Sequence, residues 1–252
     1  MKNLQIAVTG AGGFLGNNIH QKFIKTYNVS KIKLKNKKDI IVFINNLKKK
    51  KYNFVINCAA SLKPRNDWDH FINSRLPRIF NYIISKYSKK TKLYHISTIN
   101  ILNLELNDAY TISKRKAEHY LINTETVIIR PNMILSKKKE GPSKILHNYL
   151  EKKLPLYFMF KKGNSYKPIK IDDFINELEI IISNNNNNTI YNIQGESIKN
   201  IWDIFFDINK KYKKIIIPIN ISFIKYLFPQ FVKRALNKSK HFQHLNENDI
   251  FI

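Results

Sequence analysis

The 252-residue sequence predicts an α/β protein with a doubly wound parallel sheet and a small C-terminal substrate-binding lobe. Two observations predict the sheet. Strand and helix patterns alternate from Leu4 to Arg130, and a glycine cluster near residue 10 separates the first strand from the first helix. The lobe is predicted because this alternation loosens from Leu135 onward. We place the sheet domain at residues 1–135 and 168–194, and the lobe at residues 136–167 and 195–252.

The composition excludes several classes of protein. Forty-three per cent of the residues are hydrophobic, which is enough for a packed core and excludes a disordered chain. The single cysteine, Cys58, cannot form an internal disulfide and fits a reducing compartment. No stretch approaches the ~18 uncharged apolar residues of a membrane span, and the N-terminus lacks the apolar run of a secretion signal. We expect a soluble, cytoplasmic protein.

The chain is strongly basic, with 44 Lys and Arg against 18 Asp and Glu and a net charge of +26. Such a charge suits nucleic acid, but the basic residues are scattered in short runs without a recognition motif. We therefore expect a solvated basic surface rather than a nucleic-acid partner. Residues 223–240 mix apolar and basic side chains, which leaves weak contact with a membrane surface open. The scattered histidines predict no metal site.

Four of the seven glycines fall within seven residues of one another. They are Gly10, Gly12, Gly13 and Gly16. Residues 4–9 before them have the pattern of a buried strand, and Phe14 and Leu15 begin a helical repeat after them. An ordinary tight turn is the alternative, but at this place glycines let the backbone approach a pyrophosphate and aim helix amides at it. We predict a Rossmann-type cofactor loop formed by Gly10, Gly13, Phe14, Leu15 and Gly16.

The next predicted strand, residues 29–35, lacks the carboxylate that would bond a ribose 2′-hydroxyl. It carries Lys33 and Lys35 instead, which would attract a 2′-phosphate, so NADP is slightly favoured over NAD. The alternative is that these lysines only face water. Asp39 and Ile40 follow, and we expect both beside the adenine ring.

Two further strands end in residues suited to a ligand crevice, which lies at the carboxyl ends of parallel strands. Residues 53–60 end in Ala59 and Ala60, whose small side chains leave room for the cofactor. Residues 92–98 end in two hydroxyl side chains, Ser97 and Thr98.

A tyrosine and a lysine follow at helical spacing. Tyr110 and Lys114 stand at i and i+4, so they share one helix face. A nearby ammonium favours phenolate, and we therefore expect a lowered Tyr110 pKa and acid/base chemistry at neutral pH. Ser113 and Lys116 are assigned to the surface. Thr98, Tyr110 and Lys114 are the predicted catalytic residues, and the last two also contact the cofactor.

Five further segments resemble the motifs of one protein family, and they follow one another in the order that the family has. They are Asn57–Ala60, Phe71–Asn73, Ile129–Pro131, Lys170–Asp173 and Tyr191–Ile193. With the motifs above, the sequence resembles the extended short-chain dehydrogenase/reductase family, the NAD(P)-dependent epimerases, dehydratases and reductases of nucleotide sugars. The resemblance implies NADP or NAD as cofactor, a nucleotide-sugar substrate and hydride transfer at C4 of the sugar.

Departures from the family narrow the chemistry. Ile99 and Asn100 follow Thr98 where the sugar 4,6-dehydratases carry acidic residues, which disfavours dehydration. Ile99 also replaces an Asp expected in the dTDP-4-dehydrorhamnose reductases. Reductase and epimerase stay open, with Lys33 and Lys35 tilting towards the reductase. The alternative from another class is a catalytically silent NADP-binding regulator or scaffold. A homodimer is left open.

Overall fold

The computed structural model describes the chain except for residues 1–3, 50, 153–155, 161–164, 185–189 and 220–252. The chain forms two compact units. The first comprises Met1–Asn132 with Ile169–Gln194, and the second comprises Met133–Pro168 with Gly195–Ile252. The basic and apolar segment 223–240, for which the sequence leaves weak contact with a membrane surface open, lies outside the described residues.

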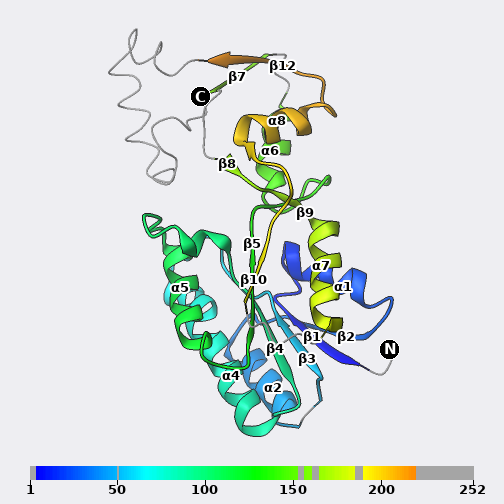
Figure 1. Cartoon of the computed structure of the whole chain (residues 1–252), viewed down its shortest axis with the longest axis vertical. Helices are drawn as coiled ribbons and strands as arrows, with labels where there is room; N and C mark the ends of the chain where they lie inside the picture. The colour runs from blue at the N-terminus through cyan, green and yellow to red at the C-terminus, as the bar shows by residue number, and fades with distance from the viewer. Residues whose placement is uncertain (1–3, 50, 153–155, 161–164, 185–189, 220–252) are drawn as a thin grey trace. The chain divides into compact units, whose positions relative to one another are not determined.

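The first unit contains a sheet of six parallel strands, which confirms the predicted fold class (Figure 1). In spatial order the strands are β2 (Asn28–Ile32), β1 (Gln5–Thr9), β3 (Phe54–Asn57), β4 (Lys92–Ile96), β5 (Val127–Pro131) and β10 (Ile190–Ile193). The chain moves outward from β1 to β2 and then returns to the other side of β1 for β3. The order therefore reverses between β1 and β3, where open parallel sheets bind their ligands.

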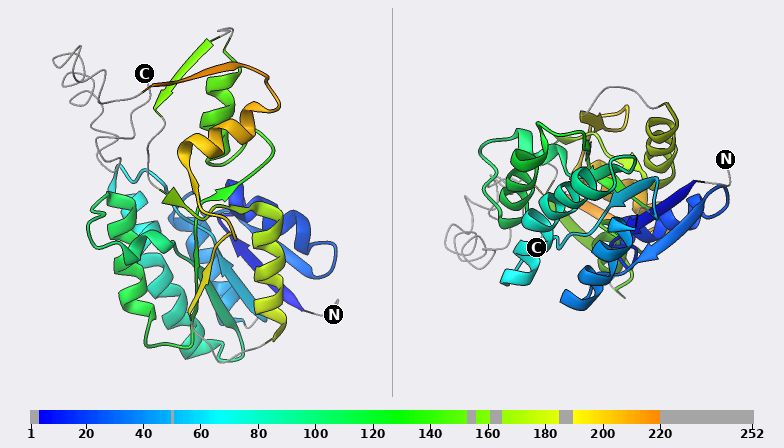
Figure 2. Two further views of the ribbon diagram at one scale, coloured as in Figure 1. Left: turned by 45° about the horizontal axis from the view of Figure 1, so that its top comes forward. Right: turned by 90° about the horizontal axis from the view of Figure 1, so that it is seen from below.

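Helices cover both faces of this sheet (Figures 1 and 2). One face carries α1 (Phe14–Phe23) and α7 (Ile171–Asn184), and the other carries α2 (Lys37–Lys48), α4 (Leu76–Tyr87) and α5 (Ala109–Leu121). Shorter elements of the unit are α3 (Asp67–His70), the π-helical turn η1 (Phe71–Arg75), the 3₁₀ turn η2 (Ile99–Leu102) and β9 (Ile169–Lys170). None of the described helices combines the length and apolar character needed to cross a membrane.

The core of the first unit explains why these segments form strands and helices. Ile6, Ala7 and Val8 of β1 are all fully buried, because a parallel sheet with helices on both faces needs apolar side chains on both sides. On α2 and α4 the buried residues recur every three or four positions. Phe43 and Phe80 from these helices meet edge to face with ring centroids 5.2 Å apart, which fixes the two helices together over β3.

The second unit is smaller, and its described residues form two helices and five short strands. Its elements are β6 (Ile134–Leu135), α6 (Ser143–Leu150), β7 (Leu156–Phe160), β8 (Ser165–Tyr166), β11 (Lys199–Asn200), α8 (Ile201–Asn209) and β12 (Ile215–Ile219). β7 pairs in parallel with β12, and β8 pairs antiparallel with β11. Leu146 and Leu150 of α6 pack with Ile204 and Phe205 of α8 to form its core.

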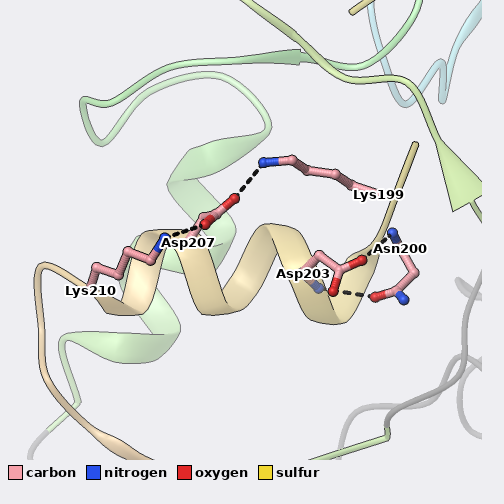
Figure 3. A network of polar contacts seen from close by, with 5 residues as sticks. All are labelled: Lys199, Asn200, Asp203, Asp207 and Lys210. Carbon is pink, nitrogen blue, oxygen red and sulfur yellow. Dashed lines mark hydrogen bonds and ion pairs between the residues drawn. The ribbon is translucent and has the colours of Figure 1, made fainter. Parts of the chain in front are cut away.

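Hydrogen bonds of Asn200 and Asp203 cap the start of α8, and Asp207 forms ion pairs further along the helix (Figure 3). The Asn200 side chain accepts from the Asp203 backbone N–H, and the Asp203 carboxylate accepts from that of Asn200, each at 3.0 Å. Together they form a capping box that satisfies backbone donors otherwise left without partners. One turn later, Asp207 forms ion pairs with Lys199 and Lys210. These hydrogen bonds and ion pairs stabilise α8, and they require no functional role to explain them.

The connection from β1 to α1 depends on two glycines. Gly10 has a φ of +66°, and a Cβ built there would lie 2.6 Å from the backbone nitrogen of Ala59. A Cβ on Gly16 would lie 2.6 Å from the carbonyl oxygen of Gly10. Both clashes involve backbone atoms, which cannot move aside without displacing β3 or the turn itself. At Gly12, in contrast, a Cβ would meet nothing within 4 Å.

We expect Gly10→Ala and Gly16→Ala each to lower the free energy of unfolding by about 3 kcal/mol, through backbone strain and overpacking. Alanine is the better helix former by about 1 kcal/mol, but at position 16 the clash should outweigh that gain. Urea unfolding followed by circular dichroism measures both changes. Gly12→Ala is the matched control and should stay within about 0.5 kcal/mol of the parent. A Gly16→Ala variant as stable as the parent would contradict this packing.

Candidate active site

The register of the sheet brings the predicted site residues to one edge. Thr9 at the end of β1 pairs with Ile32 of β2 and Asn57 of β3, and Asn57 pairs with His95 of β4. The residues that follow these strands therefore meet at the carboxyl edge of the sheet. They are the glycine turn after β1, Lys33 after β2, Ala59 and Ala60 after β3, and Ser97 and Thr98 after β4.

A buried polar network fixes three of these strand ends. The Thr9 hydroxyl donates to Asn57 Oδ1 at 2.6 Å, and Asn57 Nδ2 lies 3.1 Å from His95 Nδ1. Burial and the charge of Lys114 hold the His95 pKa well below its usual value, so the ring is neutral and its Nδ1 accepts the bond from Asn57. The network makes the edge of the sheet a rigid base for the turns above it.

The first turn of α1 has the character of an anion-binding site. Its N-cap is Gly13, and no side chain of the described residues caps it. By contrast, Asn36 caps α2 and Asp108 caps α5 with side-chain oxygens. The amides of the first turn, from Phe14 and Leu15 onward, are therefore left for a ligand.

Two further observations fit a dinucleotide at this edge. The space beside Gly12 would accept a Cβ without contact. The Ser97 hydroxyl is buried and has no hydrogen-bond partner among the described residues, as expected of a group that bonds a ligand. The residues present therefore fit a pyrophosphate on the glycine turn and a ligand group beside β4.

Lys114 is only 1% exposed, although it carries an ammonium group. Its Nζ donates to the carbonyl oxygen of Ile96, the last residue of β4, at 2.7 Å. It also lies 5.9 Å from the centroid of the Tyr110 ring, so the two residues do share a helix face. Burial lowers the pKa of Lys114 to about 8, and the nearby Cys58 and Glu118 act in the opposite direction.

The predicted lowering of the Tyr110 pKa is wrong for the chain as described. Burial raises the pKa of Tyr110 to about 12, and the nearby carboxylate of Asp108 adds to the rise. The loss of water around the phenolate outweighs the attraction of the ammonium, which is already bonded to the Ile96 carbonyl. The Tyr110 phenol therefore keeps its proton at neutral pH.

Thr98 lies between β4 and the turn η2 and is 9% exposed. Its hydroxyl oxygen accepts from the Asn100 backbone N–H at 3.3 Å. Because the oxygen is the acceptor in this bond, the hydroxyl hydrogen is left to donate to another group. Its place directly after β4 sets it beside the strand end that holds Lys114.

Ser113 is not a surface residue, which corrects the prediction, whereas Lys116 is exposed as expected. The Ser113 side chain donates to the Tyr110 carbonyl at 2.7 Å and accepts from Asn73 Nδ2 at 3.0 Å. Asn73 belongs to η1 and also bonds both backbone groups of Ser61. Helical spacing shows that Tyr110 and Lys114 share a face of α5. It does not show that Asn73, which is distant in sequence, bonds to Ser113 on the same helix.

Sequence reasoning also missed Glu118. Its carboxylate forms a buried ion pair with Arg130 of β5, with Arg130 Nη2 2.6 Å and Nε 3.0 Å from Glu118 Oε2. Glu118 stands four residues after Lys114, so it lies on the same face of α5. A glutamate at this spacing, followed by an arginine in the next strand, is the signal that could have identified it.

The remaining predicted cofactor residues, Lys33, Asp39 and Ile40, lie just after β2 and in the first turn of α2. Lys33 is exposed just beyond β2. The Asp39 carboxylate accepts from the Lys35 backbone N–H at 2.8 Å, and Ile40 packs into the core. Their contacts with a cofactor stay predictions. Within the described part of the chain, no three His, Cys, Asp or Glu side chains are grouped to hold a metal ion.

Comparisons with known proteins identify the fold. No protein-family model and no curated protein matches the chain. Among solved structures, it is similar to a dTDP-4-dehydrorhamnose reductase from Clostridium acetobutylicum, with 20% identity, a TM-score of 0.72 and coverage of 86% of this chain and 84% of that one.

Two further solved structures are similar over most of their length. One is the dTDP-4-dehydrorhamnose reductase of Bacillus anthracis in complex with NADP, with 15% identity, a TM-score of 0.68 and coverage of 87% and 85%. The other is the UDP-glucose 4-epimerase of Thermus thermophilus in complex with NAD, with 15% identity, a TM-score of 0.66 and coverage of 86% of each chain. The chain thus has the fold of these enzymes, which are of the kinds that the sequence resemblance implied.

Proposed function

We propose that this chain is an NAD(P)-dependent oxidoreductase that acts at C4 of a nucleotide-linked sugar. The observation that carries the proposal is the buried Lys114 ammonium, held at the end of β4 beneath the Tyr110 ring and beside Thr98. A buried ammonium next to a phenol has no value for packing, but it suits proton transfer to or from a bound oxygen. The similar reductase and epimerase structures support the same class of reaction.

In this proposal the glycine turn and the uncapped start of α1 hold the cofactor's pyrophosphate. Ala59 and Ala60 leave room at the end of β3, and Lys33 attracts a 2′-phosphate if NADP is bound. Asp39 and Ile40 lie towards the adenine through the first turn of α2. When bound, the nicotinamide supplies the hydride, and the protein supplies position and proton handling.

Three side chains handle the substrate oxygen in this proposal. Tyr110 exchanges a proton with it, and Thr98 donates a hydrogen bond to it. Lys114 stabilises negative charge that develops on the phenol and holds the nicotinamide ribose. The polar network of Thr9, Asn57 and His95 fixes the strand ends, so that these groups are held in position before the substrate arrives.

The protonation of Tyr110 favours reduction over epimerisation. Its pKa of about 12 means that the phenol is a proton donor at neutral pH, which suits a 4-keto group that becomes a hydroxyl. An epimerase would first need Tyr110 as a base. Together with Lys33, this supports a reductase that consumes NADPH.

The two units have different roles in this proposal. The first binds the cofactor, and the second, with its α6–α8 core, binds the nucleotide sugar. We further propose a cytoplasmic protein, because reduced cofactor and nucleotide sugars must both be at hand, and a homodimer as its assembly.

The direct test is to purify the full chain, identify any dinucleotide that co-purifies, and screen UDP-, dTDP- and GDP-linked 4-keto sugars for loss of NADPH absorbance. Loss of absorbance supports the reductase, and isomer formation without it supports an epimerase. Cofactor binding without turnover on any of these sugars would favour the rival, a catalytically silent NADP-binding regulator.

Tyr110→Phe should lower turnover by about 10³-fold, because the proton that reaches the substrate oxygen is lost. The Kd for NADPH, measured by fluorescence titration, should change by about threefold at most, since the phenol is not its main contact. Tyr120→Phe is the control, because Tyr120 is exposed on the same helix with its ring against Arg78. Full turnover in Tyr110→Phe would refute the assigned role.

Lys33→Ala should raise the Kd for NADPH by about tenfold and leave that for NADH unchanged, because one charged hydrogen bond to the 2′-phosphate is lost. Lys49→Ala removes an equally exposed charge at the other end of α2 and serves as the control. Isothermal calorimetry with both cofactors measures the effect. An equal rise in the Kd for NADPH and for NADH would show that Lys33 does not bind the 2′-phosphate.

A further inference from the structure

The Glu118–Arg130 pair connects α5 to the strand next to β4. The carboxylate receives three contacts from the guanidinium, at 2.6, 3.0 and 3.2 Å, and the two residues are 3% and 9% exposed. Burying an ion pair gives little net stability, because desolvation offsets most of the attraction. The arrangement therefore calls for a reason other than stability.

The position of Glu118 on α5 suggests that reason. It lies one turn after Lys114 and, like Lys114, on the buried side of the helix. The Lys114 ammonium has one hydrogen-bond partner among the described residues, the Ile96 carbonyl on β4. The buried side of α5 is thus bonded to two strands, to Ile96 of β4 through Lys114 and to Arg130 of β5 through Glu118. These two strands are neighbours in the sheet.

Two nearby groups favour the ammonium form of Lys114, the Cys58 thiol and the Glu118 carboxylate of the ion pair with Arg130. The Cys58 thiol, just after β3, has its pKa raised to about 12 by burial and is neutral, and burial also keeps His95 on β4 neutral. On α5, Tyr110 is a neutral phenol, and Asp108 acts on Tyr110 at the start of the helix. Arg130, on the neighbouring strand β5, brings a positive charge to this side of α5 through its ion pair with Glu118.

We propose that Glu118 is a positioning residue that acts through Lys114. Fixed by Arg130 one turn further along the buried side of α5, its carboxylate keeps the Lys114 ammonium charged for the proton transfer of the proposed function. Without the carboxylate, a buried ammonium faces only a carbonyl dipole and a nearby guanidinium. Without the guanidinium, the carboxylate acts on Lys114 unopposed. The two partners of one ion pair should therefore affect Lys114 in opposite directions.

The test is a pH titration of the ligand-free chain, with the ¹³Cε resonance of Lys114 followed by NMR and assigned with Lys114→Arg. In Glu118→Gln the titration midpoint of Lys114 should fall by about one pH unit, and in Arg130→Gln it should rise. Arg130→Lys keeps a cation and should leave the midpoint near that of the parent. A purely structural ion pair would weaken folding in both Gln variants without opposite shifts, so equal or absent shifts overturn the proposal.

The charge-neutral double variant Glu118→Gln/Arg130→Gln covers the case in which a single variant fails to fold. Its Lys114 midpoint should lie below that of the parent, and an unchanged midpoint overturns the proposal. If an active substrate is found, the alkaline limb of kcat should move to lower pH in Glu118→Gln. The NMR titration needs neither cofactor nor sugar, so failure of the proposed function and failure of this inference can be told apart.

Discussion

The hydrogen bond from the Lys114 ammonium to the Ile96 carbonyl sets the geometry of the candidate site. It joins a charged group on α5 to the last residue of β4, and a buried ammonium can be kept there only if its surroundings compensate for lost water. The Glu118 carboxylate, one turn away on α5 and held by Arg130, opposes part of the effect of burial on the Lys114 pKa. The helix α5 and the parallel strands β4 and β5 are thus bonded to one another around one charge.

A steric constraint fixes the other half of the site. Gly10 touches the backbone at Ala59, and Gly16 touches Gly10, so the turn after β1 is packed against the end of β3. This close packing leaves the first turn of α1 without a side-chain cap, open to an anion. The same absence of side chains therefore serves both the packing of the strands and the binding of a phosphate.

The alternation of strands and helices and the glycine turn after the first strand could be predicted from sequence, because they depend on local patterns. Glycine is rare in this chain, so a cluster at residue 10 is informative, and the spacing of Tyr110 and Lys114 sets their shared face. The burial of Ser113 and the Glu118–Arg130 pair depend on residues distant in sequence, and no local pattern contains them. The wrong sign of the Tyr110 pKa has the same origin, since burial is a property of the folded chain.

Burial acts in opposite directions on the two central groups of the site, because it favours the uncharged form of each. It raises the pKa of the phenol to about 12 and lowers that of the ammonium to about 8. Below about pH 8 both groups carry their protons, and the pair is then a donor rather than an acceptor. A site in this state is prepared to protonate an oxygen that gains negative charge, as a carbonyl oxygen does when hydride reaches its carbon. Burial itself, more than the choice of residues, thus keeps both groups protonated at neutral pH.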